Sequence, residues 1–380
     1  MNDAVIVAAA RTPVGKKNGA LSSIHPADLS AHILYHLAER TGIDPSEVDD
    51  VIWGCVSQVG EQTFDIARTA VLSAGWPESV PGTTVDRQCG SSQQAVHFAA
   101  AGLIAGQYDV VVAGGVESMS RIPMGSAQAT GSPFGPRYVE RYGSEYPNQG
   151  LGAEMIAEKW ALSRRRLDEF ALTSHERAAA ATDAGLFAAE IAPIEIDGGL
   201  VTFDEGVRRS GTVEKLASLR PAFREDGRIT AANASQISDG SAALLMMTGA
   251  AAARVGLTPI ARVHTAVVAG SAPMPMLTGP IPATQKALVK SGLSIDDIGV
   301  FEVNEAFASV VLAWAAEFGV DLAKVNPRGG AIALGHPLGG SGARLMTTML
   351  HHMQTENIRY GLQTMCEGGG QANATILELL

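Results

Sequence analysis

The sequence is poor in aromatic residues, in cysteine and in positive charge. Only 5% of its 380 residues are Phe, Trp or Tyr, three are Cys, and the formal net charge is −11. This composition excludes a disulfide-rich scaffold, and the sparse cysteines indicate a reducing compartment, for which we expect the cytoplasm. The acidic balance argues against nucleic acid or an anionic membrane surface as the main partner.

Long apolar runs are also missing. No segment reaches 18 uninterrupted apolar residues, so we expect no membrane span, and MNDAVIVAAARTP lacks the basic start and the cleavage site of a signal peptide. Glycine, in contrast, is abundant, with 42 residues in a chain that is 46% hydrophobic. These numbers indicate helices and strands packed closely on small side chains, and the length predicts two or three domains.

Strand-like and helix-like segments alternate in both halves of the chain. In each half a glycine-rich turn opens a helix that leads to a strand with paired glycines, Gly114 and Gly115 in the first and Gly368 and Gly369 in the second. We therefore expect an α/β fold of two related domains, with a largely parallel sheet covered on both faces. The predicted elements of the first half are strands at 4–9, 51–56 and 109–115 and helices at 26–41, 64–74 and from Cys89 to about 102.

The region between the halves breaks this pattern. A Gly, Pro and Tyr-rich stretch is followed by amphipathic helix signals over 153–184, which indicates an inserted, pocket-building domain. The predicted domains are residues 1–117 with 238–258, the insertion 118–237, and 259–380. A basic stretch in the insertion fits either a solvated face or a polyphosphate ligand. Its members are Arg208, Arg209, Lys215, Arg220, Arg224 and Arg228.

Three short stretches carry reactive side chains in glycine-rich settings. They are Cys89 in DRQCGSS, His336 in GGAIALGHPLGGSGAR and Cys366 in MCEGGGQ. A thiolate attacks a thioester or ketone carbon well if a base takes its proton and N–H groups receive the oxyanion. A single cysteine would fit a buried core position equally well, and we assign Cys55 to the core. The coincidence of three such contexts favours one acyl-transfer site.

These stretches, together with GGVESMS and NEAFA, resemble the thiolases in content and in order, over essentially the whole chain. The resemblance implies two similar mixed-sheet α/β domains in a five-layered αβαβα arrangement, plus a loop domain that binds coenzyme A. It also implies a homodimer or homotetramer, coenzyme A as co-substrate, and neither a tightly bound cofactor nor a metal. The implied reaction is thiolytic cleavage of a 3-ketoacyl-CoA in fatty acid or steroid degradation, or the reverse Claisen condensation.

The resemblance assigns roles to individual residues. Cys89 is the nucleophile that becomes acylated, His336 is its base, and Cys366 is the acid/base at the α-carbon. Asn304 holds a water that forms one oxyanion hole with the His336 imidazole, although Asn304 alone fits a helix cap equally well. The backbone N–H groups of Cys89 and Gly368 form the other oxyanion hole.

The resemblance also assigns coenzyme A contacts in and near the loop domain. Ser235 matches the serine at the pantetheine arm, and Phe307 belongs to the same binding surface. Arg208, Leu219 and Phe223 match residues at the nucleotide end. Arginine pairs well with phosphate, but a solvated arginine is the ordinary alternative.

Two features bear on the substrate. Many thiolases carry His-Met-Gly where this chain has Asn148, Gln149 and Gly150, which speaks against acetoacetyl-CoA as the preferred substrate. The glutamine-rich setting of Cys89 is similar to thiolases that process steroid side chains. The alternatives are a biosynthetic acetoacetyl-CoA thiolase, a decarboxylating condensing enzyme on the same fold, and a non-catalytic acyl-CoA or lipid-binding homologue. Cys366 favours a thiolase over a decarboxylating enzyme, because only the non-decarboxylative reaction must make its own carbanion.

Overall fold

The computed structural model describes residues 3–143 and 147–380; part of the tyrosine-rich stretch, residues 144–146, lies outside them. In the first half of the chain the strand order is β4-β3-β5-β8-β1, with the short β2 on β8. Strand β3 is parallel to β4 and β5, whereas β8 is antiparallel to β5 and β1. The elements are β1 (Val5–Arg11), β2 (Gly15–Lys16), α1 (Pro26–Thr41), β3 (Asp50–Gly54), α2 (Ile66–Ser73), β4 (Gly82–Val85), α3 (Ser91–Ala105), β5 (Val110–Ser118), β8 (Ser238–Met247) and α8 (Gly249–Val255).

The second half repeats this arrangement in the order β10-β11-β12-β9. Strand β10 is parallel to β11, and β12 is antiparallel to both β11 and β9. Strands β1 and β9 pair at Val5 and Ile6, so the two halves share one ten-stranded sheet within the described residues. The elements are β9 (Ala261–Gly270), α9 (Pro280–Ser291), β10 (Val300–Val303), α10 (Ala308–Phe318), α11 (Ala331–Leu334), α12 (Ser341–Glu356), β11 (Tyr360–Glu367) and β12 (Gln371–Leu379).

The expectation of a largely parallel sheet is wrong for the central strands. The turn between β11 and β12 explains why, because its few residues are too short for the crossover that parallel neighbours need. Gly369 and Gly370 adopt φ angles of 82° and 79° in this turn, a conformation that glycine adopts readily. The architectural repeat of the two halves is otherwise as the sequence predicts.

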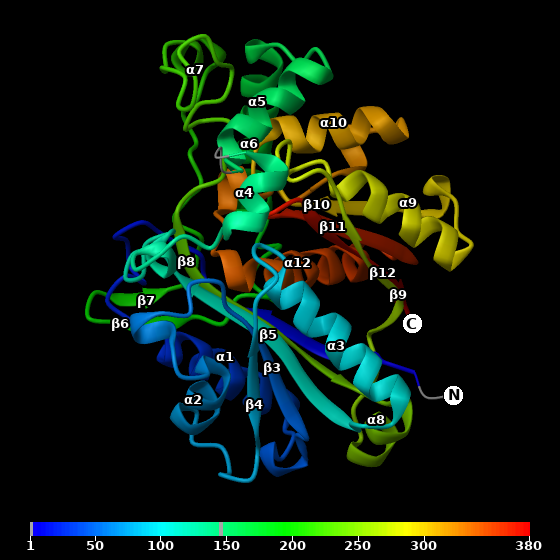
Figure 1. The fold of residues 1–380 in the computed structure, drawn as a ribbon. Coiled ribbons are helices and arrows are strands. Elements are labelled where there is room, and N and C mark those ends of the chain that lie inside the picture. Colours follow the sequence, from blue (N-terminus) through cyan, green and yellow to red (C-terminus); the bar gives the residue numbers. More distant parts are fainter. Residues whose placement is uncertain (1–2, 144–146) are drawn as a thin grey trace.

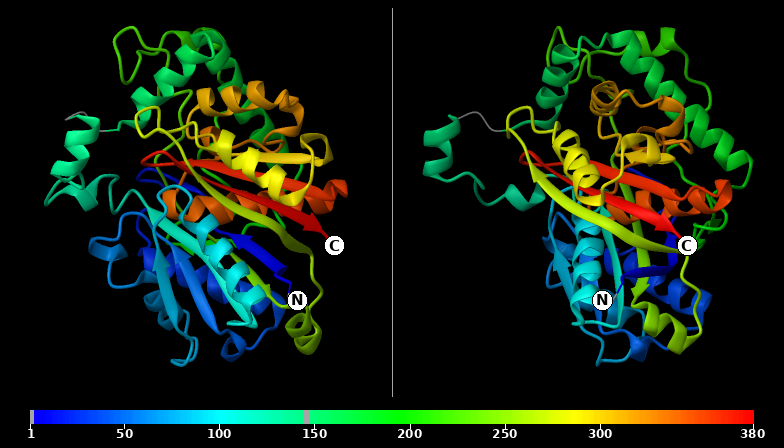
Figure 2. Two further views of the ribbon diagram at one scale, coloured as in Figure 1. Left: turned by 45° about the vertical axis from the view of Figure 1, so that its right-hand side comes forward. Right: turned by 90° about the vertical axis from the view of Figure 1, so that its right-hand side faces the viewer.

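The elements form five layers, which confirms the predicted fold class (Figures 1 and 2). Helices α1 and α2 cover the outer face of the first half-sheet, and α9 and α10 cover the outer face of the second. Helices α3 and α12 pack against each other between the two half-sheets, on a core of small and aliphatic side chains. The abundant small residues thus allow two helices and two sheets to approach closely.

The insertion contacts both halves of the molecule: its two long helices lie on the second half, whereas Ala192 and Ile194 pack into the core of the first half. Helices α5 (Gln149–Lys159) and α6 (Arg164–Asp183) pack on α10 and share its core, whereas α4 (Pro136–Tyr142) projects from the body (Figure 2). The remaining elements are β6 (Ile194–Ile196), β7 (Gly199–Val201) and α7 (Val213–Ala217). The exact domain boundaries stay a prediction. Among the described helices, none is long and apolar enough to cross a membrane.

Candidate active site

Cys89 lies at the N-terminal end of α3, in a turn that is held by its own side chains. Gln88 adopts a φ of 49°, a left-handed conformation that is uncommon for a residue with a side chain. Its N–H donates to Asp86 Oδ1 at 2.6 Å, and its carbonyl accepts from Ser91 Oγ at 2.6 Å. The turn leaves Cys89 partly exposed on the wall of a cavity. Nothing in the sequence signals the unusual backbone at Gln88.

Cys366 also lies next to the Cys89 turn, near the end of β11 and just before the turn that leads to β12. It is buried and lies close enough to Cys89 for a charge on the Cys89 sulfur to raise the pKa of Cys366. Gly368 lies against the Cys89 turn, because an ideal Cβ on Gly368 would lie only 2.7 Å from Gln88 Oε1. The fold therefore brings together the two cysteine turns that the sequence places almost 280 residues apart.

His336 lies in the turn between α11 and α12 and is buried. Its Nδ1 is 2.6 Å from Ser341 Oγ, whose own hydrogen is donated to the Pro337 carbonyl at 2.8 Å. This pattern assigns the ring proton to Nδ1, so that Nε2 carries the lone pair. A histidine in this tautomer can accept a proton at Nε2, as a base must. Ser341, which fixes the tautomer, was not singled out by the sequence analysis.

Asn304 faces the His336 ring from the end of β10. Its Nδ2 lies 3.3 Å from His336 Nε2, and its Oδ1 has no hydrogen-bond partner among the described residues although the residue is buried. Helix α10 begins only at Ala308 and has Phe307 as its N-cap. The helix-cap interpretation of Asn304 is therefore wrong, and its amide remains available to the site.

Burial sets the resting charge of these groups. It raises the pKa of Cys89 to about 12, with a further rise from the charge of Glu367. It also raises the pKa of Cys366, and it lowers the pKa of His336 to about 3. The resting site thus holds neutral thiols and a neutral imidazole. No hydrogen bond joins Cys89 Sγ to His336 in the described part of the chain, although Leu338, two residues after His336, lines the same cavity as Cys89.

A buried carboxylate, Glu117 of β5, ties the two halves of the site together. It accepts hydrogen bonds from the backbone N–H groups of Val56, Ser57 and Gly339, at 3.0, 3.1 and 2.9 Å. Gly339 belongs to the His336 turn, whereas Val56 and Ser57 follow β3. Glu117 lies in the GGVESMS stretch, but its role was not predicted from the sequence. A carboxylate in a buried, apolar strand was the available signal.

The cavity at Cys89 has a volume of about 660 Å³. Residues of both halves and of the insertion line it: Val56, Ser57, Asp86, Gln88, Cys89, Met124, Gly125, Ala127, Gln128, Pro133, Phe134, Pro147, Asn148, Gln149, Met276, Leu338, Gly368, Gly369 and Gln371. Asn148 also caps α5, since its Oδ1 accepts from the N–H groups of Gly150 and Leu151 at 2.9 and 3.1 Å. The segment that replaces His-Met-Gly therefore forms part of the cavity wall.

The structure brings together some of the predicted coenzyme A contacts. The N–H of Ser235 donates to the Ala306 carbonyl at 2.9 Å, next to Phe307, and the rings of Phe223 and Phe307 meet edge to face with centroids 6.0 Å apart. Arg208 and Leu219 are exposed and do not line the cavity at Cys89.

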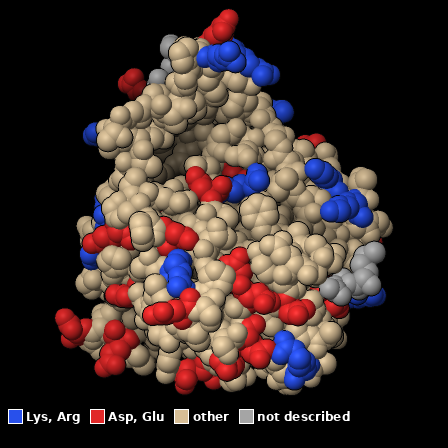
Figure 3. Space-filling view, turned by 60° about the horizontal axis from the view of Figure 1, so that its bottom comes forward, with Lys and Arg blue, Asp and Glu red and all other residues tan. Residues whose placement is uncertain are grey.

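Part of the basic stretch is already occupied by protein groups. Arg209 pairs with Asp183, Arg224 pairs with Asp226, and Arg228 donates to backbone carbonyls. The side chains of Arg208 and Arg220 form no ion pair within the residues that the structure describes. Acidic side chains spread widely over the face seen in Figure 3, as the net charge of −11 requires. Few arginines of the basic stretch are therefore available to bind a polyphosphate.

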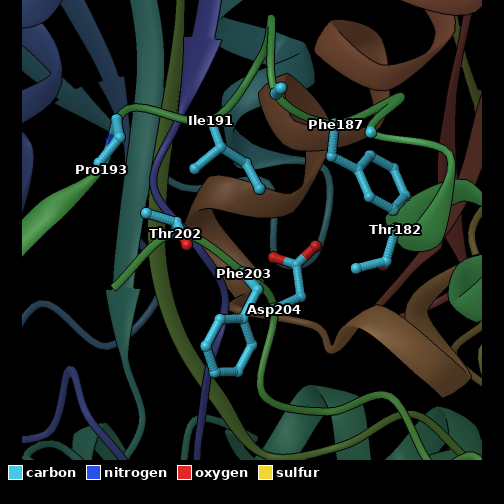
Figure 4. A pocket seen from close by; sticks show the side chains of 9 residues that line it. Thr182, Phe187, Ile191, Pro193, Thr202, Phe203 and Asp204 are labelled. Carbon is cyan, nitrogen blue, oxygen red and sulfur yellow. The ribbon is translucent and has the colours of Figure 1, made fainter. Parts of the chain in front are cut away.

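A second cavity of about 300 Å³ lies apart from the site (Figure 4). Phe187, Ile191 and Phe203 supply its apolar wall, and Asp204 also lines it. The Asp204 carboxylate is taken up by a two-point ion pair with Arg11, at 2.7 and 2.9 Å. Within the described residues, no three His, Cys, Asp or Glu side chains gather in a way that could hold a metal ion.

The five-layered fold and the cavity shared by two cysteine turns define a class of two-domain α/β proteins built for cysteine-based acyl transfer. Family models described as the thiolase N-terminal and C-terminal domains match residues 4–250 and 257–379. The chain belongs to the thiolase family.

Known relatives match this chain over its full length. A steroid 3-ketoacyl-CoA thiolase, FadA6, of Mycobacterium tuberculosis is 54% identical, over 100% of this chain and 95% of the relative. A 3-ketoacyl-CoA thiolase of Erwinia tasmaniensis is 48% identical over 100% of both chains. The crystal structure of the Bacillus anthracis acetyl-CoA acetyltransferase superposes with a TM-score of 0.90 at 38% identity, covering 100% of this chain and 99% of the other.

Proposed function

We propose that this protein is a 3-ketoacyl-CoA thiolase, an acyltransferase that forms an acyl-enzyme on Cys89. The observation that carries the proposal is that the Cys89 and Cys366 turns meet at one cavity. In the adjoining turn, His336 carries its proton on Nδ1, so that Nε2 can accept a proton. A non-catalytic binding protein has no need for this set of groups. The names of the relatives, which include 3-ketoacyl-CoA thiolases, agree with the proposal.

Cleavage begins at the ketone carbon of the substrate. Cys89 Sγ attacks that carbon and passes its proton to His336 Nε2, so that charge develops on the ketone oxygen. Because the resting groups are neutral, the proton moves only as the oxyanion forms and is stabilised. The alkoxide then collapses, the bond between the α-carbon and the ketone carbon breaks, and its electron pair remains on the α-carbon.

Cys366 completes the reaction as the acid/base at the α-carbon. Its Sγ–H protonates the carbanion and releases acetyl-CoA, which leaves a thiolate on Cys366. A second coenzyme A gives its thiol proton to that thiolate and attacks the acyl group on Cys89. Cys89 recovers its proton from His336, so the enzyme returns to its starting state and the shortened acyl-CoA leaves. Condensation is the same sequence in reverse.

Two oxyanion holes serve the two oxygens that acquire charge. The buried Oδ1 of Asn304, which has no partner among the described residues, fits a water-holding role beside the His336 ring. The backbone N–H groups of Cys89 and Gly368 form the second hole. Removal of a single oxyanion donor typically costs about 10²- to 10³-fold in kcat, so both pairs bear strongly on the rate.

Coenzyme A binds along the loop domain in this proposal. Ser235 and Phe307 contact the pantetheine arm, and Phe223 continues that surface toward the nucleotide. Arg208 and Leu219 contact the nucleotide end outside the cavity, where Arg208 has no competing ion pair among the described residues. Coenzyme A acts as a co-substrate, and we propose a homodimer or homotetramer in the cytoplasm.

The acyl group occupies the 660 Å³ cavity. Asn148 and Gln149 form part of its wall, which supports bulky or medium-to-long acyl groups, including ring-bearing ones, over acetoacetyl-CoA. The name of the M. tuberculosis relative supports the ring-bearing class. A thiolysis assay that follows the loss of short, long and ring-bearing 3-ketoacyl-CoAs tests the proposal. Loss that requires coenzyme A and yields acetyl-CoA is expected, and the absence of turnover on every substrate would reject it.

A further inference from the structure

Glu367 is a fully buried carboxyl group behind the nucleophile. It follows Cys366 along β11 but points to the other side, toward the start of α3. An ideal Cβ on Gly90 would lie 1.9 Å from Glu367 Oε1, so only glycine fits next to Cys89. Neither carboxyl oxygen of Glu367 has a hydrogen-bond partner among the described residues. An unpaired buried polar group is costly, so this arrangement requires an explanation.

Asn373 supplies a second unpartnered oxygen in the same space. The Gly90 Cβ position lies 2.6 Å from Asn373 Oδ1, so this oxygen and Glu367 Oε1 face a common point. Asn373 Nδ2 donates to Gln94 Oε1 at 3.1 Å and lies 3.1 Å from His97 Nδ1, which uses both of its hydrogens. The Oδ1 atom then needs a donor. A proton on Glu367 satisfies both oxygens at once, whereas an ionised carboxylate would leave two acceptors facing each other.

The surrounding charges agree with a protonated Glu367. Burial raises its pKa to about 8, against the opposing influence of Arg87 and of the Asn373 backbone N–H, which lies near the carboxyl group without a hydrogen bond of ordinary geometry. Asp86 adds to the rise. The other titratable groups around this space are Cys89, Cys366, Glu117 and His97. His97 stays neutral, because burial lowers its pKa to about 3.

We propose that Glu367 is a positioning residue held as a neutral acid, with its O–H donated to Asn373 Oδ1, so that no negative charge lies behind Cys89 during acylation. Its ionisation opposes the formation of the Cys89 thiolate, since a like charge nearby disfavours the anion. At alkaline pH, where Glu367 ionises, it therefore limits the formation of the Cys89 thiolate. The inference rests on the proposed function only for its consequence in catalysis, because the state of Glu367 can be measured without substrate.

The test is the pH dependence of Cys89 alkylation by iodoacetamide, followed on the Cys89 peptide by mass spectrometry. Glu367→Gln keeps the shape and can donate to Asn373 Oδ1, but it cannot ionise. We expect wild type and variant to react equally at pH 6 to 7. Above pH 8 the variant should be alkylated faster than the wild type, by up to about tenfold. This factor is the change in the thiolate fraction that one pKa unit produces.

Glu302→Gln is the matched control. Glu302 is also buried without a partner among the described residues, and burial raises its pKa to about 8. It lies in β10, however, and is not among the groups that raise the pKa of Cys89. This variant is expected to follow the wild-type alkylation profile. A gain for Glu302→Gln equal to that of Glu367→Gln would overturn the assignment to Glu367.

The wild-type protein gives a second measurement if Glu367→Gln does not fold. The logarithm of its alkylation rate should rise with pH, flatten near pH 8 as Glu367 ionises, and rise again above it. A straight line through this range contradicts the proposal. So do parallel profiles for wild type and Glu367→Gln, or a variant that is slower by the same factor at every pH, as a structural defect would be. Thiolysis assayed separately at pH 7 reports on the proposed function independently.

Discussion

Gln88 and Gly368 meet where the two halves of the chain face each other. Gln88 precedes the nucleophile and holds a left-handed backbone, and Gly368 follows Cys366 by two residues. An ideal Cβ on Gly368 would lie 2.7 Å from Gln88 Oε1 and 3.1 Å from its Cγ. A side chain at position 368 would therefore require the Gln88 side chain to move.

Gly368→Ala should reduce turnover at least tenfold while the protein still folds. The new Cβ meets the flexible end of a side chain and not backbone, so the clash displaces the Gln88 side chain next to Cys89 and does not unfold the sheet. Small displacements of reacting groups are costly in rate. The measurements are kcat/KM for thiolysis and the melting temperature. Gln88→Ala removes the clashing atoms, so the double variant should recover part of the activity; no recovery would mean that this contact is not the cause.

Cys366→Ala should separate the two halves of the reaction. Cys89 is still acylated by acetyl-CoA in this variant, because its own base is His336. The exchange of the α-protons of acetyl-CoA with deuterated solvent, followed by NMR, should fall by at least about 10²-fold, as expected when an acid/base group is removed. Exchange at the wild-type rate would show that another group acts at the α-carbon.

Acid should destabilise the protein through its buried histidines. The native pKa of His97 is lowered to about 3 by burial, whereas an unfolded histidine titrates near 6.5. Between these values the unfolded state binds the extra proton, so the free energy of unfolding falls as the pH falls, by up to about 1.4 kcal/mol per pH unit for each such histidine. The melting temperature of His97→Gln should therefore drop less than that of wild type between pH 6.5 and pH 4.5. Equal drops in the melting temperature of the two proteins would mean that groups other than His97 cause the acid sensitivity.

Substrate size should appear in kcat/KM. A bulky or medium-to-long 3-ketoacyl-CoA should be cleaved at least ~10-fold more efficiently than acetoacetyl-CoA, a difference of about 1.4 kcal/mol in transition-state stabilisation. The reason is the cavity of about 660 Å³, whose wall includes Asn148 and Gln149 in place of His-Met-Gly. A higher kcat/KM for acetoacetyl-CoA would contradict this prediction and identify the protein as a short-chain thiolase.

The alternating strands and helices and the reactive turns were predicted because each is encoded locally, whereas the five layers were implied by the resemblance to the thiolases. Apolar runs with glycine-rich ends mark the strands, and Cys89, His336 and Cys366 stand in short, distinctive contexts. The direction of the central strands was predicted wrongly. The short turn between β11 and β12 is a local signal that was overlooked, but the pairing of β8 with β5 and β1, and of β1 with β9, is long-range. Local patterns carry no record of such pairing.

The supporting residues of the site were not predictable in the same way. Glu117 and Ser341 act through hydrogen bonds to groups that are distant in sequence or whose geometry is set by folding. The unusual φ of Gln88 also follows from the surrounding turn and not from the residue type. Asn304 was assigned two roles, and only the start of α10 at Ala308 removed the helix cap from consideration.

Formation of an acyl-enzyme on Cys89 tests the proposed mechanism directly. Intact-protein and peptide mass spectrometry after brief mixing with acetyl-CoA should show one added acetyl group, located on Cys89. Cys89→Ala should show no adduct and lose thiolysis by several orders of magnitude, whereas Cys366→Ala should keep the adduct. An acetyl group on Cys366 or elsewhere in the wild type, or thiolysis that persists in Cys89→Ala, would contradict the assignment of Cys89 as the nucleophile.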